Sequence, residues 1–188
     1  MEKIKIWRLI DLVGTCAYEA ALAAIKNIFF QTSSRKYFKD AHEKQQFYFK
    51  WTGLYYEEHL DSFYIATLVD DPIHVVGYLT GCDNSLSALD FYRDRVASYQ
   101  IFEEHFSAFP AHLHINCLPE YQGIGIGKKL MERFFCDLSA RQVRGVHIIT
   151  SGEARNIGFY HRLEFDFVAE KDFCGSRLRF MGKLLLKQ

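Results

Sequence analysis

A glycine-rich segment between a strand pattern and a helix pattern constrains this chain most. The segment is Gln122–Lys128, with the sequence Gln-Gly-Ile-Gly-Ile-Gly-Lys. Before it, residues 111–117 alternate apolar and polar side chains, which is typical of a strand with one buried face. After it, apolar residues recur at helical spacing from Leu130 to Leu138. A strand, a glycine turn and a helix start aim backbone N–H groups and the positive end of a helix at one point, so the segment predicts a phosphate-binding loop.

Spacing separates three kinds of glycine loop that bind phosphate groups. A dinucleotide loop needs Gly-x-Gly-x-x-Gly, and here the last position is Lys128. A nucleoside-triphosphate loop needs Ser or Thr after its Gly-Lys pair, and here Lys129 follows Lys128. The third kind has Gln-x-x-Gly-x-Gly after a lead-in such as Pro119-Glu120-Tyr121. This arrangement resembles the acetyl-coenzyme A loop of the GCN5-related N-acetyltransferases, the GNAT superfamily.

The resemblance to this superfamily extends over roughly residues 111–168 and returns near the end of the chain. The segments that carry it are Pro119–Gly123, the buried strand pattern of Gly145–Thr150, the helix-to-strand segment Ile157–Phe165 and the closing strand Met181–Leu185. Residues 110–115 and 145–147 further resemble the branch that includes the acetyltransferase-like domain of some O-GlcNAc hydrolases. The resemblance implies one GNAT domain over residues 1–188, of the α/β (α+β) class, with a central mixed, mostly antiparallel sheet flanked by helices.

Periodicity along the chain predicts the same order of elements. We expect strands at 4–9, 63–69, 74–82, 111–117, 145–151, 165–171 and 177–186, and helices at 11–30, 35–60, 128–138 and 155–163. The second helical region is expected to break near Thr52-Gly53, and Asp70-Asp71-Pro72 is expected to form a hairpin turn. A mostly helical insertion near residues 84–109 is the least familiar part for this superfamily.

The resemblance implies acetyl-CoA as co-substrate and assigns residues to it. The strand at 115–118 would pair with the pantetheine arm, the loop amides would hold the pyrophosphate, and Tyr160 would protonate the departing thiolate. The coenzyme-binding residues so implied are Ile115, Asn116, Cys117, Leu118, Gln122, Gly123, Ile124, Gly125, Ile126, Gly127, Lys128, Asn156 and Tyr160.

Three positions depart from the family pattern. Glu153 stands where the family usually has Asn, which leaves Asn156, at a position that is usually Ala, as the candidate for that polar contact to the pantetheine arm. Glu164 replaces the Gly of Leu-Gly-Phe, at a helix C-terminal turn where Gly is preferred for its positive φ.

The general base is less well defined than the acid. Residues 146–150 lack the Glu that some family members use, so His114 is the first candidate and His112 and His147 are weaker ones. A structural histidine and proton transfer through water remain open alternatives. Cys117 alternates with core residues and is expected to be a buried thiol. His112-x-His114 has no third ligand motif nearby, so no metal site is expected.

Composition limits which binding partners and which cellular compartment are expected. Lys plus Arg and Asp plus Glu number 23 each, so no attraction to nucleic acid or to an anionic membrane is implied. The first residues resemble no secretory signal, and no apolar stretch is long enough to span a bilayer. Five scattered cysteines favour reduced thiols and a cytoplasmic protein. A homodimer stays open, since dimers are frequent in the family.

Two functions follow from the resemblance. The first is acetyl transfer from acetyl-CoA to a primary amine of a small molecule or protein, by direct attack in a ternary complex. The alternative is a catalytically inactive acyl-CoA-binding or protein-interaction domain, for which Glu153 and the missing strand Glu argue. A nucleotide- or NAD-dependent enzyme is disfavoured by the loop spacing.

Overall fold

A seven-stranded sheet forms the framework of the protein, in the order β1-β2-β3-β4-β5-β7-β6. The computed structural model describes residues 4–68 and 71–185. The β1–β2, β2–β3, β5–β7 and β6–β7 pairs are antiparallel, and β4 and β5 are parallel. The chain forms two compact units, one within Met1–Gly81 and His114–Phe134 and one within Cys82–Leu113 and Phe135–Gln188. The α/β class with a mixed, mostly antiparallel sheet is confirmed, whereas a single domain over residues 1–188 stays a prediction.

The first unit is built on three antiparallel strands. β1 (Lys5–Arg8) pairs with β2 (Phe63–Thr67), and β2 pairs with β3 (Val75–Cys82). Every residue of β2 and β3 is buried. Strands that are apolar along their whole length need cover on both faces. The predicted turn between these strands includes Asp70, which lies outside the described residues.

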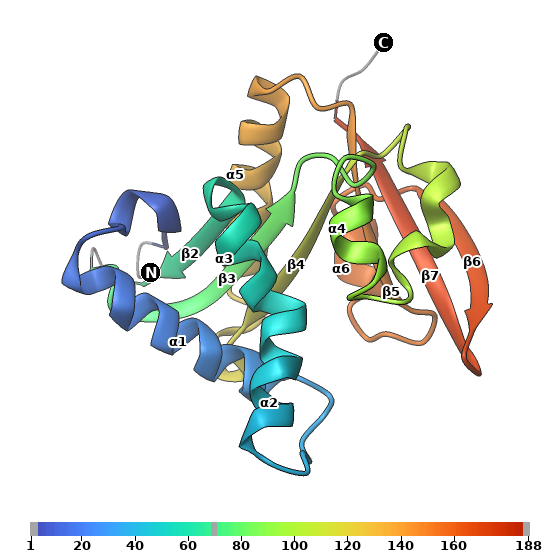
Figure 1. Ribbon diagram of the computed structural model, residues 1–188. Helices are drawn as coiled ribbons and strands as arrows, with labels where there is room; N and C mark the ends of the chain where they lie inside the picture. The colour runs from blue at the N-terminus through green and yellow to red at the C-terminus, as the bar shows by residue number, and fades with distance from the viewer. Residues whose placement is uncertain (1–3, 69–70, 186–188) are drawn as a thin grey trace. The chain divides into compact units, whose positions relative to one another are not determined.

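Helices supply part of this cover in the first unit. α1 (Cys16–Thr32) buries Ala21, Ile25, Ile28 and Phe29, which lie on one helical face. It is followed by α2 (Ala41–Tyr48), a π-helical turn (Phe49–Gly53, called the π turn below) and α3 (Leu54–Glu58). α1 begins five residues later than predicted from residue 11, because residues 9–12 form a 3-10 turn and Gly14 has a φ of 82°. Figure 1 shows α3 crossing in front of β3.

The second unit holds the remaining strands. β5 (Gly145–Ser151) and β6 (Phe167–Phe173) pair with opposite edges of β7 (Ser176–Leu184). The first residues of β4 (Ala111–Cys117) join them, because Ala111 and His112 pair in parallel with Val146 and His147. α6 (Ile157–His161) is shorter than the predicted helix, and β6 begins two residues later than predicted.

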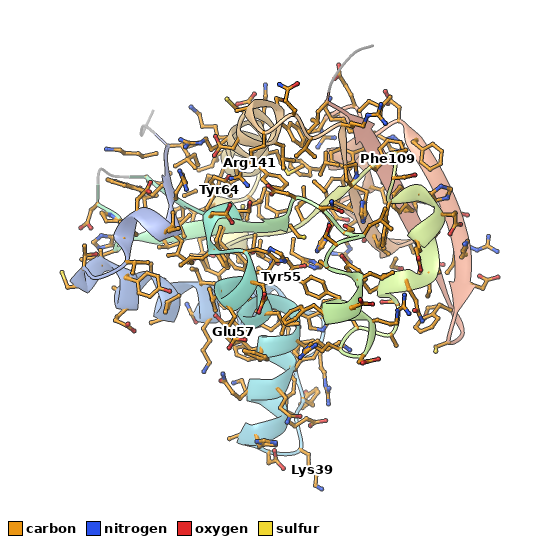
Figure 2. All side chains as sticks on the ribbon, turned by 45° about the horizontal axis from the view of Figure 1, so that its top comes forward. Lys39, Tyr55, Glu57, Tyr64, Phe109 and Arg141 are labelled. Atoms are coloured by element: carbon orange, nitrogen blue, oxygen red, sulfur yellow. The ribbon has the colours of Figure 1, made fainter. Side chains whose placement is uncertain are left out.

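The insertion contains short helices rather than one long helix. α4 (Leu89–Arg93) and a 3-10 stretch (Tyr99–His105) lie beside β5 and β7 in Figure 1. Phe102 and Phe109, the latter labelled in Figure 2, pack against Phe180 of β7 at ring-centroid distances of 5.5 and 5.8 Å. The insertion therefore completes the core of the second unit.

No helix in residues 4–68 or 71–185 is both long enough and apolar enough to cross a membrane.

Candidate active site

The glycine loop is anchored where β4 ends. The N–H of Leu118 donates to the carbonyl of Val76 at 2.9 Å, which ties the end of β4 to β3. The chain then makes a 3-10 turn (Pro119–Tyr121). The side chain of Gln122 reaches back and donates from Nε2 to the carbonyl of Cys117 at 3.0 Å. The predicted Gln of the loop motif thus holds the loop against the strand, and α5 (Ile126–Ala140) follows.

The glycines of the loop leave its main chain accessible. Gly123 and Gly125 have φ angles of 82° and 96°, a conformation that side chains with a Cβ rarely adopt. A Cβ built at either position meets no atom within 4 Å, so open space lies beside the backbone. Residues 122–125 are exposed, whereas Ile126 is buried and anchors the start of α5.

The start of α5 provides donors for an anion. The first helical hydrogen bond runs from Lys129 N to the carbonyl of Gly125 at 3.1 Å. The N–H groups of Ile126, Gly127 and Lys128 precede it, and such groups have no acceptor within a helix. They lie at the positive end of the helix dipole. The ammonium of Lys128 adds positive charge and lies 3.6 Å from the carboxylate of Glu132. These donors and the open space suit a pyrophosphate group.

Cys117 is unsuited to nucleophilic chemistry. A Cβ at Gly77 would come within 2.9 Å of its Sγ and 3.1 Å of Ile126, so the thiol lies against the β3–α5 contact in the first unit. Burial raises the pKa of Cys117 to about 12, which keeps the thiol protonated. Cys117 was predicted to be a buried thiol; the residue as a whole is half-buried, with its Sγ packed against these neighbours.

His114 lies among aromatic rings of the first unit. Its imidazole makes edge-to-face contacts with Trp51 of the π turn, at a centroid distance of 5.8 Å, and with Tyr55 of α3, at 5.5 Å. Tyr55 is labelled in Figure 2. Burial lowers the pKa of His114 from 6.5 to about 4. An imidazole usually titrates near neutral pH, but that of His114 is neutral at pH 7, which argues against the predicted role as general base.

The two weaker base candidates are core residues of the second unit. His112 is 6% exposed, and its Nδ1 lies 2.8 Å from the hydroxyl of Ser85. His147 is 1% exposed, and its Nδ1 donates to the carbonyl of Phe109 at 2.6 Å, because a carbonyl can only accept. Alternation along β4 placed His112 on a polar face, but the insertion covers that face at His112. Both histidines attach the insertion to the sheet, so the structure does not support either as a base.

Tyr160 and Asn156 lie in the second unit. Asn156 is exposed just before α6, and its carbonyl accepts from the N–H groups of Phe159 and Tyr160 at 3.0 and 3.3 Å. Tyr160 is 5% exposed, and its ring packs edge-on against Phe165 at 5.5 Å. Glu164 has a φ of 64°, which agrees with the predicted turn where the family carries Gly. Its carboxylate pairs with Lys183 at 2.6 Å.

Glu153, where the family usually has Asn, is exposed in the loop before α6. Within the described chain, no group of three or more His, Cys, Asp or Glu side chains is placed to hold a metal ion.

Sequence reasoning missed the environment of β4. It assigned Asn116 a main-chain role, but the Asn116 side chain contacts Thr32 and Tyr78. It also did not indicate that Trp51 and Tyr55 contact the imidazole of His114. No local pattern indicates these contacts, because the partners are far apart along the chain.

Comparison with known proteins agrees with this geometry. Residues 61–166, more than half of the chain, match the family model described as an acetyltransferase (GNAT) domain. Three solved structures share the fold, and each is covered at 95% or more of its own length. SsHAT is 22% identical over 98% of this chain, with full coverage of its own and a TM-score of 0.72. A chain of the NatC complex bound to Gag peptide and CoA is 14% identical, with 98% of each chain covered and a TM-score of 0.60.

The third solved structure is yncA from Salmonella typhimurium, a putative acetyltransferase with its cofactor acetyl-CoA. It is 16% identical, covers 99% of this chain and 95% of its own, and has a TM-score of 0.57. At such low identities, these structures show a common fold, and the family model shows the family. The chain therefore belongs to the GNAT superfamily and is an N-acetyltransferase of that type.

Proposed function

We propose that this N-acetyltransferase transfers the acetyl group of acetyl-CoA to a primary amine of a small molecule or protein, by direct attack in a ternary complex. The observation that carries the proposal is the loop at residues 122–128. It joins two positive-φ glycines, open space beside the main chain and the start of α5. Such a loop recognises a diphosphate through backbone donors.

The residues that would hold the coenzyme follow from this loop. Amides from Gly123 to Lys128 bind the pyrophosphate, and the main chain of residues 115–118 pairs with the pantetheine arm. Asn156 supplies a polar contact where Glu153 replaces the usual Asn. The acetyl-CoA in the yncA structure and the CoA in the NatC structure support this choice of co-substrate.

The transfer makes one bond and breaks another. The neutral amine nitrogen forms a bond to the acetyl carbon while the carbon–sulfur bond of the thioester breaks. Tyr160 donates a proton to the departing thiolate and regains one from water, and the amine loses one. Because the pKa of His114 is about 4, its imidazole is too weak a base to keep that proton at pH 7. His114 therefore accepts a hydrogen bond from the amine and orients it, and water carries the proton away.

Binding and turnover test the proposal separately. Calorimetry should show binding of acetyl-CoA and not of ATP or NAD. Thiol release should then be measured with spermidine, tyramine, glucosamine and a lysine-containing peptide, and at least one should be acetylated. No binding of acetyl-CoA would overturn the proposal. Binding without thiol release from any amine would favour a catalytically inactive acyl-CoA-binding domain, which the exposed Glu153 at the usual Asn position motivates.

The role of Tyr160 predicts that its removal lowers the rate of acetyl transfer much more than it weakens acetyl-CoA binding. Tyr160→Phe removes the acid, so kcat should fall by about 100-fold, which is typical of losing a general acid. The Kd for acetyl-CoA should stay within about twofold of the wild-type value, because the loop amides and not Tyr160 bind the pyrophosphate. Tyr37→Phe is the matched control, since Tyr37 is 90% exposed in the α1–α2 connection. Unchanged turnover in Tyr160→Phe would remove this assignment.

A further inference from the structure

A group of four polar side chains connects β4 to distant parts of the first unit. Oδ1 of Asn116 lies 2.9 Å from Oγ1 of Thr32, the last residue of α1. Nδ2 of Asn116 lies 3.0 Å from the phenol oxygen of Tyr78 on β3. That oxygen lies 3.3 Å from Oγ1 of Thr52 in the π turn. We call Thr32, Thr52, Tyr78 and Asn116 the amide clamp.

The hydroxyl protons of the amide clamp all have acceptors when its hydrogen bonds run in one direction. The Thr32 hydroxyl has one proton and also lies 2.8 Å from the carbonyl of Ile28. A half-turn of the Asn116 amide exchanges its nitrogen and oxygen with almost no change of shape. In that rotamer Thr52 donates to Tyr78, Tyr78 to the amide oxygen, the amide nitrogen to Thr32, and Thr32 to Ile28. Each of the three hydroxyl protons and one of the two amide protons then has an acceptor, as buried polar groups require.

The Tyr78 and Thr52 side of the amide clamp is shielded from water, whereas Asn116 and Thr32 are half-buried. Tyr78 is 0% exposed and Thr52 is 1% exposed. Burial raises the pKa of Tyr78 well above its usual value, so the phenol keeps its proton. A buried hydrogen-bond network that is fully satisfied holds its elements in one arrangement, because any shift leaves a donor without a partner.

We infer that Asn116 is a positioning residue. It holds the π turn, whose Trp51 contacts His114, in a fixed position relative to residues 115–118 of β4. The inference rests on the proposed function, in which residues 115–118 pair with the pantetheine arm. Thr52 lies next to Trp51, whose ring contacts His114, so the amide clamp joins the π turn to β4. The end of α1 is joined through Thr32.

Loss of the amide clamp should disturb the binding and placement of the amine more than the binding of acetyl-CoA. The end of β4 is also held by the hydrogen bond from Leu118 to Val76, which no clamp residue supplies. The strand that binds acetyl-CoA therefore stays in place. The π turn and the end of α1 lose their link to it, so the amine is held less well against the acetyl carbon. Small misplacements of reacting groups cost about 100-fold in rate.

Matched variants separate positioning from folding. Tyr78→Phe removes the hydroxyl that contacts Asn116 and keeps the ring. Thr32→Val removes the second hydroxyl that contacts Asn116. Thr32→Ser restores the hydroxyl at the second position. Tyr48→Phe is the control, because its buried phenol is hydrogen-bonded to the phenol of Tyr56 in the same unit.

Three measurements are made on each variant: the acetyl-CoA Kd by calorimetry, kcat and KM for the best amine of the panel above, and hydrogen exchange of the 49–55 amides with and without acetyl-CoA. In Tyr78→Phe and Thr32→Val we expect an acetyl-CoA Kd within about threefold of wild type, with the amine KM raised and kcat lowered by about tenfold each. Acetyl-CoA should slow exchange at 49–55 in wild type, Tyr48→Phe and Thr32→Ser, and not in the two clamp variants.

The outcomes distinguish the inference from the proposed function. If wild type binds no acetyl-CoA, the proposed function fails, and the inference fails with it. If acetyl-CoA binds but slows exchange at 49–55 equally in wild type and Tyr78→Phe, the positioning role alone is overturned. A fall in kcat with unchanged amine KM would also overturn it, because that pattern reports a smaller folded fraction. The hydrogen-exchange measurement tests the positioning role of the amide clamp even when no amine of the panel is acetylated.

Discussion

At the scale of single residues, His114 shows how packing changes the chemistry of a side chain. Trp51 and Tyr55 surround its imidazole, and burial lowers its pKa from 6.5 to about 4. The charged form is the costly one in this environment, since water is replaced by aromatic rings. A residue that resembled a base in the sequence is therefore a neutral imidazole in the fold.

This pKa shift predicts a pH-dependent stability. The unfolded chain binds a proton at His114 near pH 6.5, and the folded protein binds it only near pH 4. The stabilisation is thus complete above pH 6.5 and is lost as the pH falls toward 4. At about 1.4 kcal/mol per pH unit, the loss between pH 7 and pH 4.5 is about 2.5 kcal/mol. Urea unfolding of wild type and His114→Gln at both pH values measures it. The variant should lose about 2.5 kcal/mol less than wild type, and parallel losses would contradict the shift.

At the scale of elements, the glycine loop works because its two ends are held. Gln122 ties the loop to β4, and buried Ile126 ties it to the core of the first unit. Between them, Gly123 and Gly125 take positive φ angles beside open space. The loop is therefore preorganised for its ligand, which reduces the ordering cost of binding.

A matched pair of glycine variants tests the loop. Gly14 and Gly123 both have a φ of 82°, and a Cβ at either meets nothing within 4 Å. Substitution by Ala should therefore cost both variants a similar 1–2 kcal/mol of unfolding free energy, roughly the strain of this conformation. Urea unfolding measures this cost. Only Gly123→Ala should also weaken acetyl-CoA binding in calorimetry, by about tenfold or more, because its Cβ occupies space beside the phosphate donors. Equal affinities in the two variants would contradict a phosphate site at this loop.

The insertion is also an element whose role is visible in its contacts. Ser85 contacts His112 through its hydroxyl at 2.8 Å, and its carbonyl accepts from the phenol of Tyr99 at 3.1 Å. These bonds attach the segment to β4 inside the second unit. The insertion thus buries the start of the same strand whose end carries the glycine loop.

At the scale of the whole molecule, three elements run through both units. β3 passes from one to the other after Gly81, β4 after Leu113 and α5 after Phe134. Loss of either unit would remove part of a strand or helix from the other. We therefore expect one cooperative unfolding transition.

Ligand binding should raise the temperature of that transition. Acetyl-CoA at about 100 times its Kd adds about 2.7 kcal/mol to the folded state. For a chain of this size, this corresponds to a rise in Tm of about 5–10 °C. Calorimetric scans with acetyl-CoA, ATP and NAD at equal concentrations measure it, and only acetyl-CoA should shift the transition. A larger shift with ATP or NAD would support the nucleotide-dependent enzyme that the loop spacing disfavours.

The sequence by itself determined the family, the order of the elements and the place of the glycine loop. These depend on local signals, namely glycine spacing and the periods of strands and helices. β5 covers the predicted residues 145–151, and Glu164 has the positive φ of the predicted turn. Both are properties of neighbouring residues.

Only the tertiary structure decided which polar residues are buried and which meet. His112 and His114 alternate identically on β4, but the insertion covers one and the π turn with α3 covers the other. Asn116 meets Thr32 and Tyr78 across 84 and 38 positions of sequence. Such contacts depend on which distant segments pack together, and that depends on the free energy of the whole fold rather than on the pattern of any one segment.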